Sequence, residues 1–220
     1  MLIAGIIGSE GKVQTASLIN SILAAKGKKV SVIDSASLLG LDGNRIKAYI
    51  SELGKNNIDL LLLKASITDI DKFIFDEVQF DIVIYTDKAE DSSGPDRNEY
   101  SEKMERIFSL MVDKGVAIVN VDDIDLITLL QGMKHSFVTY GFNTKASITT
   151  SSIGDSVFKD TFICCLQRSI STRNGKIIEP QEYKLKLEAS EFDSHNVLAA
   201  ASFAIINGID LNNISEIPTM

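Results

Sequence analysis

A glycine-containing stretch near the start of the chain has residue types that can bind phosphate. Gly8-Ser9-Glu10-Gly11-Lys12 separates the apolar run from Leu2 to Ile7 from a segment with helical periodicity. Glycines let the backbone approach an anion, and the free N–H groups at a helix start can point toward it. A lysine after the last glycine adds a mobile positive charge for terminal phosphates. The stretch therefore predicts a phosphate-binding turn between a strand and a helix.

Two residues depart from the complete phosphate-loop pattern. In that pattern a Ser or Thr follows the lysine and holds magnesium, whereas this chain has Val13, whose side chain cannot ligate a metal. Glu10 also places a negative charge inside the loop. The residues alone leave two interpretations open, a phosphate-binding turn and an ordinary tight turn with a surface lysine.

The segments on both sides of this turn predict an α/β fold. Apolar runs alternate with segments of helical periodicity, which is typical of a mostly parallel central sheet with helices on both faces. Strands are expected at residues 2–7, 28–34, 58–63, 80–86, 116–120 and 136–141, and helices at 18–23, 46–53, 69–78, 100–111, 122–130 and 193–207. Gly115 is expected to end the fourth helix. Ligands bind at the carboxyl ends of such strands, where Lys64 and the polar loop of residues 87–99 fall.

The pattern changes between residues 146 and 189. β segments follow one another there without intervening helices, and Asn174-Gly175 is a hairpin signal between residues 162–171 and 176–187. We expect a small antiparallel subsheet in this region. The chain shows no internal repeat or linker, so residues 1–220 are expected to form one domain.

Composition limits the classes of partner and the compartment. The formal net charge is −8, from 22 basic and 30 acidic residues, and no basic cluster offsets it, so nucleic acid is not expected as a partner. The only cysteines, Cys164 and Cys165, are adjacent, which suits small buried side chains in a reducing compartment better than disulfides or a metal site. No apolar run approaches the roughly 20 residues that span a bilayer. A cytoplasmic protein without membrane contact is therefore expected.

Four motifs resemble those of a known enzyme family. They are Gly8 to Lys12, Val119-Asn120-Val121-Asp122-Asp123, Thr139-Tyr140-Gly141 and the run from Phe192 to Ala200. In this order and spacing they resemble the ATP-binding central domain of the Mur ligases, which cyanophycin and folylpolyglutamate synthetases share. Asp122-Asp123 matches the family, although an acidic pair at a helix start is also common.

The resemblance implies a fold and a ligand. Family members are three-domain enzymes that use ATP and magnesium to activate a carboxylate as an acyl phosphate, which then reacts with an amine. A P-loop-like domain is implied, with ATP or another adenine nucleotide at residues 8–13 and Lys64. Two family asparagines that contact the base match Asp193 and Asn196. The flanking ligase domains are expected to be absent from residues 1–220, and a partner protein would supply them.

The departures from the family fall on its metal site. The positions of the family's hydroxyl, glutamate and histidine ligands match Val13, Lys64 and Ser92. The position of its carbamylated lysine matches Met104, with Lys103 one place away and therefore turned from the site by about 100°. Magnesium prefers hard oxygen ligands, so magnesium is not expected here.

Three functions follow from these observations. The first is nucleotide or phosphate binding without autonomous amide-ligase activity. In this case Lys64 adds positive charge beside Lys12, unless it pairs with Glu10 or Asp91. The second is a subunit of a split ATP-dependent carboxylate-amine ligase of the cell-wall or polyglutamate type, and the third is non-catalytic partner binding. A serine triad is not expected, since His135 and His195 lie on different elements.

Overall fold

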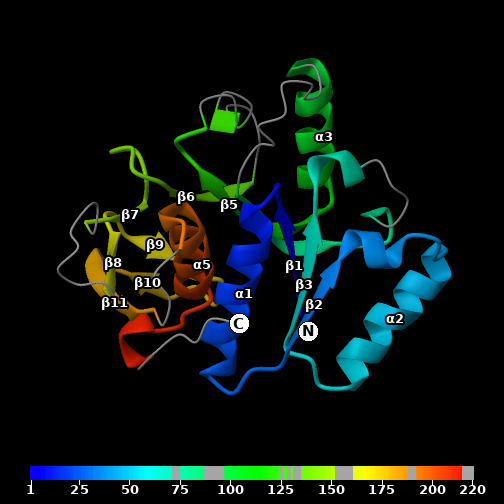
Figure 1. The fold of residues 1–220 in the computed structure, drawn as a ribbon, viewed down its shortest axis with the longest axis horizontal. Coiled ribbons are helices and arrows are strands. Elements are labelled where there is room, and N and C mark those ends of the chain that lie inside the picture. Colours follow the sequence, from blue (N-terminus) through cyan, green and yellow to red (C-terminus); the bar gives the residue numbers. More distant parts are fainter. Residues whose placement is uncertain are drawn as a thin grey trace.

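A nine-stranded sheet forms the centre of the part of the molecule that the structure describes (Figure 1). The structure is a computed structural model that describes residues 1–70, 75–86, 97–123, 126–127, 130, 135–151, 161–187 and 192–214. The strands are β1 (Leu2–Ile7), β2 (Val30–Asp34), β3 (Leu60–Ala65), β4 (Phe80–Tyr85), β5 (Met111–Asn120), β6 (Ser136–Tyr140), β7 (Ile148–Thr150), β8 (Thr161–Leu166) and β11 (Gln181–Lys186). Their order across the sheet is β11-β8-β7-β6-β5-β4-β1-β3-β2.

The strands from β2 to β7 in this order are parallel to one another, as the alternating sequence pattern predicts. β1 lies between β3 and β4, and Ile7 is in register with Ala65 on one side and Tyr85 on the other. Because the strands are parallel, their carboxyl ends meet at one edge of the sheet. The glycine turn that follows β1 therefore lies beside the ends of β3 and β4.

Helices cover both faces of the sheet, and each face has its own hydrophobic core. α1 (Gly11–Ala24) and α5 (Ser194–Ile206) pack side by side on one face (Figure 1). α2 (Gly43–Lys55) and α3 (Arg97–Ser109) contribute to the core on the other face. Ile6 and Ile7 are both fully buried but belong to the two different cores, because successive strand residues point to opposite faces. The predicted mostly parallel sheet with helices on both faces is confirmed.

The antiparallel region differs from the prediction in one respect. β7 pairs in parallel with β6 and antiparallel with β8, and β8 pairs antiparallel with β11, so these strands extend the main sheet. Their inward residues, such as Leu166 and Leu185, join the core under α5, which explains why they continue the sheet. The separate small sheet consists of β9 (Ile170–Ser171) and β10 (Ile177–Ile178), joined by the predicted hairpin turn with Gly175 at φ +81°.

The position predicted for one helix end is wrong. α3 ends at Ser109, and Gly115 lies inside β5. Met111 pairs with Phe80 and Val116 pairs with Ile82, so the intervening residues of β5 bulge from the ladder, and Met111 is buried. β5 thus begins at Met111, five residues before the predicted start at residue 116, because Met111 is buried where it pairs with β4.

Several shorter elements complete the described chain. Three 3₁₀ helices are η1 (Ser35–Leu38), η2 (Ile67–Asp69) and η5 (Leu211–Asn213). The helices predicted at residues 69–78 and 122–130 and the loop predicted at 87–99 lie partly outside the described residues. Among the described helices, none has the length and apolar character needed to cross a membrane.

Candidate functional site

The glycine turn occupies the predicted place between β1 and α1. α1 begins at Gly11, and Glu10 is its N-cap residue, with an exposed side chain that makes no capping hydrogen bond. The Gly8 N–H donates to the Ala65 carbonyl oxygen at 3.1 Å, which joins the turn to the end of β3. The Thr86 N–H donates to the Ile7 carbonyl oxygen at 3.0 Å, which joins it to the end of β4. The start of α1 is thereby fixed at the carboxyl edge of the sheet.

The ammonium group of Lys12 lies across this turn. Nζ donates to the Gly8 carbonyl oxygen at 3.2 Å and to Ser66 Oγ at 2.7 Å. Ser66 is itself held in place, because its N–H donates to Asp69 Oδ2 at 3.0 Å. An ammonium group has three donors, so these two contacts position Lys12 while leaving it able to donate to an anion.

Lys64 pairs with a carboxylate that the sequence did not single out. Its Nζ lies 3.6 Å from Asp34 Oδ2, at the end of β2, and its side chain is 19% exposed. Asp34 also accepts a hydrogen bond from the Ala36 N–H at 3.1 Å, as the N-cap residue of η1. The partner is thus Asp34 rather than Glu10, while Asp91 lies outside the described residues. The charge of Lys64 is shared with a carboxylate beside the turn.

Three of the four positions that match the family's metal ligands, Val13, Lys64 and Met104, have no side-chain oxygen atom. Val13 is 53% exposed on α1, and Met104 is fully buried in the core beneath α3. Ser92 lies outside the described residues. The side chain of Lys103, one place away, is only 10% exposed, and its Nζ pairs with Glu99 Oε1 at 2.6 Å. Val13, Lys64 and Met104 together do not fit magnesium, which binds oxygen ligands.

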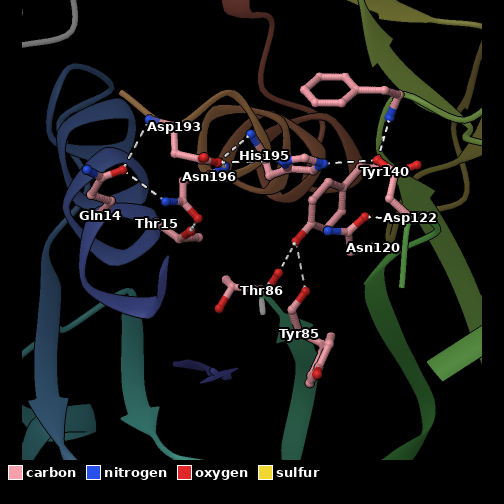
Figure 2. A network of polar contacts seen from close by, with 11 residues as sticks. Gln14, Thr15, Tyr85, Thr86, Asn120, Asp122, Tyr140, Asp193, His195 and Asn196 are labelled. Atoms are coloured by element: carbon pink, nitrogen blue, oxygen red, sulfur yellow. Dashed lines mark hydrogen bonds and ion pairs between the residues drawn. The ribbon is translucent and has the colours of Figure 1, made fainter. Parts of the chain in front are cut away.

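The first turn of α5 brings Asp193 and Asn196 against α1. Asp193 Oδ1 accepts from the N–H groups of His195 and Asn196 at 2.8 and 3.3 Å and so caps the helix. Asn196 Nδ2 donates to Gln14 Oε1 at 2.9 Å, and Asn196 Oδ1 accepts from Thr15 Oγ1 at 3.4 Å (Figure 2). The buried amide of Asn196 therefore ties the start of α5 to α1, whereas the side chain of Asp193 is 58% exposed.

Asp122 holds the other side of α5. Its Oδ2 accepts from the Phe142 N–H at 2.7 Å and lies 2.9 Å from His195 Nε2, while its Oδ1 accepts from the Asn143 N–H at 3.0 Å. Gly141 has φ +144°, and a Cβ atom there would lie 2.6 Å from Asp122 Oδ2. Only glycine suits this backbone conformation and this close approach. One carboxylate thus joins the loop after β6 to the start of α5.

These contacts set the ionisation of Asp122. Partial burial raises the pKa of the carboxyl group, but the hydrogen bonds from Phe142, His195 and Asn143 outweigh burial. The pKa of Asp122 is therefore held below its ordinary value, because each of these contacts favours the charged form.

A buried chain of tyrosines connects the strand ends below. Tyr140 OH donates to the carbonyl oxygens of Tyr85 and Thr86 at 2.8 and 3.3 Å (Figure 2). Tyr100 OH donates to Tyr85 OH at 2.7 Å, and Tyr85 OH donates to Asp123 Oδ2 at 3.2 Å. Burial, with the nearby Tyr100 and Asp123, raises the pKa of Tyr85 far above its usual range. These contacts fix the ends of β4 and β6 relative to each other.

The acidic pair at residues 122 and 123 performs two separate roles. Asp123 Oδ1 accepts from the Leu126 N–H at 3.1 Å, which is the helix-start contact that the sequence allowed. Asp122 instead turns toward the loop after β6.

The histidine and cysteine residues that the sequence singled out lie elsewhere in the fold. His135 contacts the ring of Phe108, while Cys164 is buried and Cys165 is half-buried at successive positions of β8.

Several residues of the site were not predicted from the sequence. Gln14 and Thr15 position Asn196, Phe142 contacts His195, and Asp34 pairs with Lys64. Gln14 and Thr15 follow Lys12 by two and three places on α1, which faces α5, so an expected contact between the two helices would have identified them. Phe142 follows Tyr140-Gly141, and an apolar ring directly after a loop glycine was the available signal.

The parallel sheet, the glycine turn and the helix starts at its carboxyl edge define an α/β fold of the kind that binds ligands at that edge. A comparison with protein families matches residues 6–204 to the family described as Mur ligase middle domain. The chain belongs to this family, and the resemblance seen in the sequence motifs is confirmed.

Individual relatives agree with this assignment. The chain is 25% identical over 236 residues to the chloroplastic UDP-N-acetylmuramoyl-L-alanyl-D-glutamate–2,6-diaminopimelate ligase MurE homolog of Arabidopsis thaliana, covering 97% of this chain and 29% of that protein. A solved structure of a UDP-N-acetylmuramoyl-L-alanyl-D-glutamate–2,6-diaminopimelate ligase has a TM-score of 0.70 at 17% identity, covering 96% of this chain and 44% of the other. Escherichia coli FolC in complex with DHPP and ADP has a TM-score of 0.62 at 17% identity, covering 96% of this chain and 57% of FolC. The chain thus spans less than half the length of the curated ligases it matches.

Proposed function

We propose that this chain binds an adenine nucleotide or phosphate at the glycine turn without magnesium, and that it does not carry out amide ligation by itself. Membership of the Mur ligase middle-domain family supports a nucleotide ligand, and one structural neighbour is described in complex with ADP. The relatives are ligases of cell-wall precursors, so we place the role of this chain beside cell-wall peptide synthesis in the cytoplasm.

The observation that carries this proposal is that the glycine turn has groups that bind an anion, while the positions beside it lack groups that bind a metal. The turn keeps the parts that bind an anion, namely the N–H groups at the start of α1 and the ammonium group of Lys12. The adjacent positions Val13 and Lys64 lack the oxygen atoms that a metal needs. Binding of phosphate and binding of magnesium are therefore separable at this site.

The charge of Lys64 argues further against a metal. A divalent cation and an ammonium group about 4 Å apart repel each other by several kcal/mol, even at an effective dielectric constant of about 20. Asp34 offsets part of this charge, yet its carboxylate already pairs with Lys64 and caps η1. The same ammonium group favours a phosphate anion, since opposite charges attract.

Asp193 and Asn196 are the proposed contacts to the base. The carboxylate of Asp193 is exposed beside the start of α5, and its oxygen atoms can accept a hydrogen bond from the amino group of adenine. Asn196 lies directly behind it with its amide bonded to Gln14 and Thr15. In this arrangement Asp193 supplies the contact and Asn196 fixes its position.

Isothermal titration calorimetry with ATP, in magnesium and in chelator, tests the proposal. We expect binding that is no tighter with magnesium than with chelator. Lys12→Ala should weaken it strongly, because it removes the cation at the turn. Lys26→Ala is the matched control, since Lys26 lies beyond the other end of α1, where its Nζ donates to the Asn213 carbonyl oxygen at 3.1 Å. Lys64→Glu combined with Val13→Thr should begin to restore a dependence on magnesium.

Two other outcomes would replace the proposal. Magnesium-dependent ATP hydrolysis or acyl-phosphate formation, abolished by Lys12→Ala, would identify a subunit of a split carboxylate-amine ligase. That alternative draws support from the relatives of the chain, which are described as ligases. Absence of any binding by ATP, with or without magnesium, would instead favour a non-catalytic partner-binding protein.

A further inference from the structure

An aromatic ring stands exposed at the carboxyl edge of the sheet. Phe142 follows β6 and is 42% exposed, although it is a large apolar side chain in an otherwise polar loop. Its ring centroid lies 4.3 Å from that of His195, with the two planes inclined at 53°. His195 therefore supports one side of the ring, and surface remains available on the rest of it.

The position of this ring is fixed by its backbone. Asp122 accepts from the Phe142 N–H and from the next N–H, while the same carboxylate contacts His195. The glycine at position 141 permits this close approach. Hydrogen bonds thus hold an apolar ring in an exposed place, where the hydrophobic effect alone would favour its burial.

A series of hydrogen bonds across the carboxyl ends of β6, β4 and β1, here called the floor, joins the loop of Phe142 to the glycine turn. Tyr140, which ends β6, donates to the Thr86 carbonyl oxygen, and Thr86 donates to the Ile7 carbonyl oxygen just before Gly8. In the order β6-β5-β4-β1 this floor crosses three strand spacings, or roughly 14 Å at about 4.8 Å each. The span is comparable with the length of an extended nucleoside triphosphate. Figure 2 shows Gln14 and Thr15 on one side of the first turn of α5, with Asp122 and Tyr140 on the other.

We propose that Phe142 is the surface on which the base of a bound nucleotide stacks, with His195 supporting the ring from behind. This inference rests on the proposed nucleotide-binding function and names a further residue of that site. Every base has a π face, so stacking on an aromatic ring favours nucleotides over inorganic phosphates without selecting one base. Selection for an amino-bearing base such as adenine is then left to the acceptor oxygens of Asp193.

The absence of tryptophan from the sequence makes a direct test possible. Phe142→Trp introduces the only tryptophan of the chain, at the proposed stacking position. Titration with ATP in chelator should change its fluorescence, whereas titration with inorganic tripolyphosphate should not, because tripolyphosphate has the same phosphates and no base.

Calorimetry on variants of the same residue provides the second measurement. Phe142→Ala should weaken ATP binding about tenfold or more and leave tripolyphosphate binding unchanged, while Phe142→Tyr should bind ATP as the unmodified chain does. Tyr49→Ala is the matched control, since Tyr49 is another exposed aromatic residue, on α2, and its loss should change neither affinity.

The outcomes separate this inference from the function on which it rests. If the unmodified chain binds neither ATP nor tripolyphosphate, the proposed function is wrong and the stacking role falls with it. If it binds both and Phe142→Ala binds ATP equally well, the nucleotide site stands and the stacking role is wrong, which would leave Phe142 as a contact for another protein. Equal weakening of ATP and tripolyphosphate by Phe142→Ala would also overturn it, since the residue would then support the fold of the whole site.

Discussion

The two ends of the candidate site are built differently. At the base end, Asp122, His195 and Asn196 join separate elements through short hydrogen bonds, and Asn196 is buried. At the phosphate end, Lys12 bonds to its own turn and to Ser66, while Lys64 reaches Asp34 only at 3.6 Å. At the proposed base end, hydrogen bonds thus join α5 to α1 and to the loop after β6, whereas the proposed phosphate end depends on the two ammonium groups of Lys12 and Lys64.

This difference bears on which chemistry the proposed site can support. Phosphoryl transfer depends on a metal that offsets charge as it develops, and the side chains at Val13, Lys64 and Met104 cannot hold one. Positioning of a base requires only that the ends of β6 and the starts of α1 and α5 stay together. The hydrogen bonds of Asp122 and Asn196 provide that positioning, and they therefore support the proposal that a nucleotide is bound without phosphoryl transfer.

Substitution of Gly141 should disturb the base end most strongly. Gly141→Ala forces a side chain into a backbone conformation of φ +144° and toward Asp122 Oδ2, 2.6 Å from the new Cβ. Backbone strain of this kind costs about 1–3 kcal/mol, and displacement of Asp122 adds to it. Urea unfolding measures the loss. Gly54→Ala is the control, because a Cβ there meets nothing within 4 Å and should stabilise α2 by up to about 1 kcal/mol. Equal stability of the Gly141→Ala and unmodified chains would show that Asp122 is not held as described.

Removal of the amide at position 196 should have the next largest effect. Asn196→Ala removes the amide contact to Thr15 Oγ1, which is buried, and the contact to Gln14 Oε1, which then keeps the Asp193 N–H at 3.4 Å, at a cost of about 1–3 kcal/mol in unfolding free energy. A double-mutant cycle with Gln14→Ala isolates the pair. A coupling energy near zero would mean that the two helices are held together by apolar packing alone.

The base end should also show a defined pH dependence. The folded-state pKa of Asp122 is lowered from the ordinary value of 3.8, so its carboxylate stabilises the fold above that value and loses this contribution as the pH falls through the folded pKa. The stability difference between the unmodified chain and Asp122→Asn should therefore shrink as the pH is lowered below about 4, through the folded-state pKa. Urea unfolding at several pH values measures it. A difference that grew on acidification would contradict the described contacts.

At the phosphate end the smallest effect on stability is expected. Lys64→Met keeps the aliphatic length of the side chain and removes its charge, and the lost pair with the 41% exposed Asp34 should change the unfolding free energy by less than about 1 kcal/mol. If Lys64→Met lowered the unfolding free energy as much as Asn196→Ala does, the contacts at the two ends would contribute equally to stability. The difference described between the two ends would then be wrong.

The fold was predictable because its signals are local and repeated. Apolar runs such as Leu60 to Ala65 mark buried parallel strands, and Asn174-Gly175 marks a hairpin turn that the structure contains. The start of β5 at Met111 was not predictable in this way, because its pairing with Phe80 depends on a neighbour distant in sequence. The extension of the main sheet through β8 and β11 likewise depends on which core their side chains cover.

The site was predictable only where the residues that act together are adjacent in the sequence. Gly8 to Lys12 identified the turn, since glycine, helix start and lysine are adjacent in sequence. The pairs Lys64 with Asp34 and Asp122 with His195 join residues from separate elements, so their geometry emerges only when the strands are ordered. The resemblance predicted Asn196 as a base contact, whereas its hydrogen bonds to α1 were visible only in the structure.

The hydrogen bond between Gln14 and Asn196 also affects how strongly a ligand can be bound as a whole. It joins the helix that carries the glycine turn to the helix that carries Asp193, so the two ends are presented at a fixed separation. A molecule attached at one end then meets the other at a high effective concentration, in the millimolar range or above. The proposed site can therefore bind phosphate alone and a base alone weakly and still bind a nucleotide, in which the two are covalently linked, with high affinity. Loosening the helix pair would lower that avidity while leaving the affinity for each separate fragment intact.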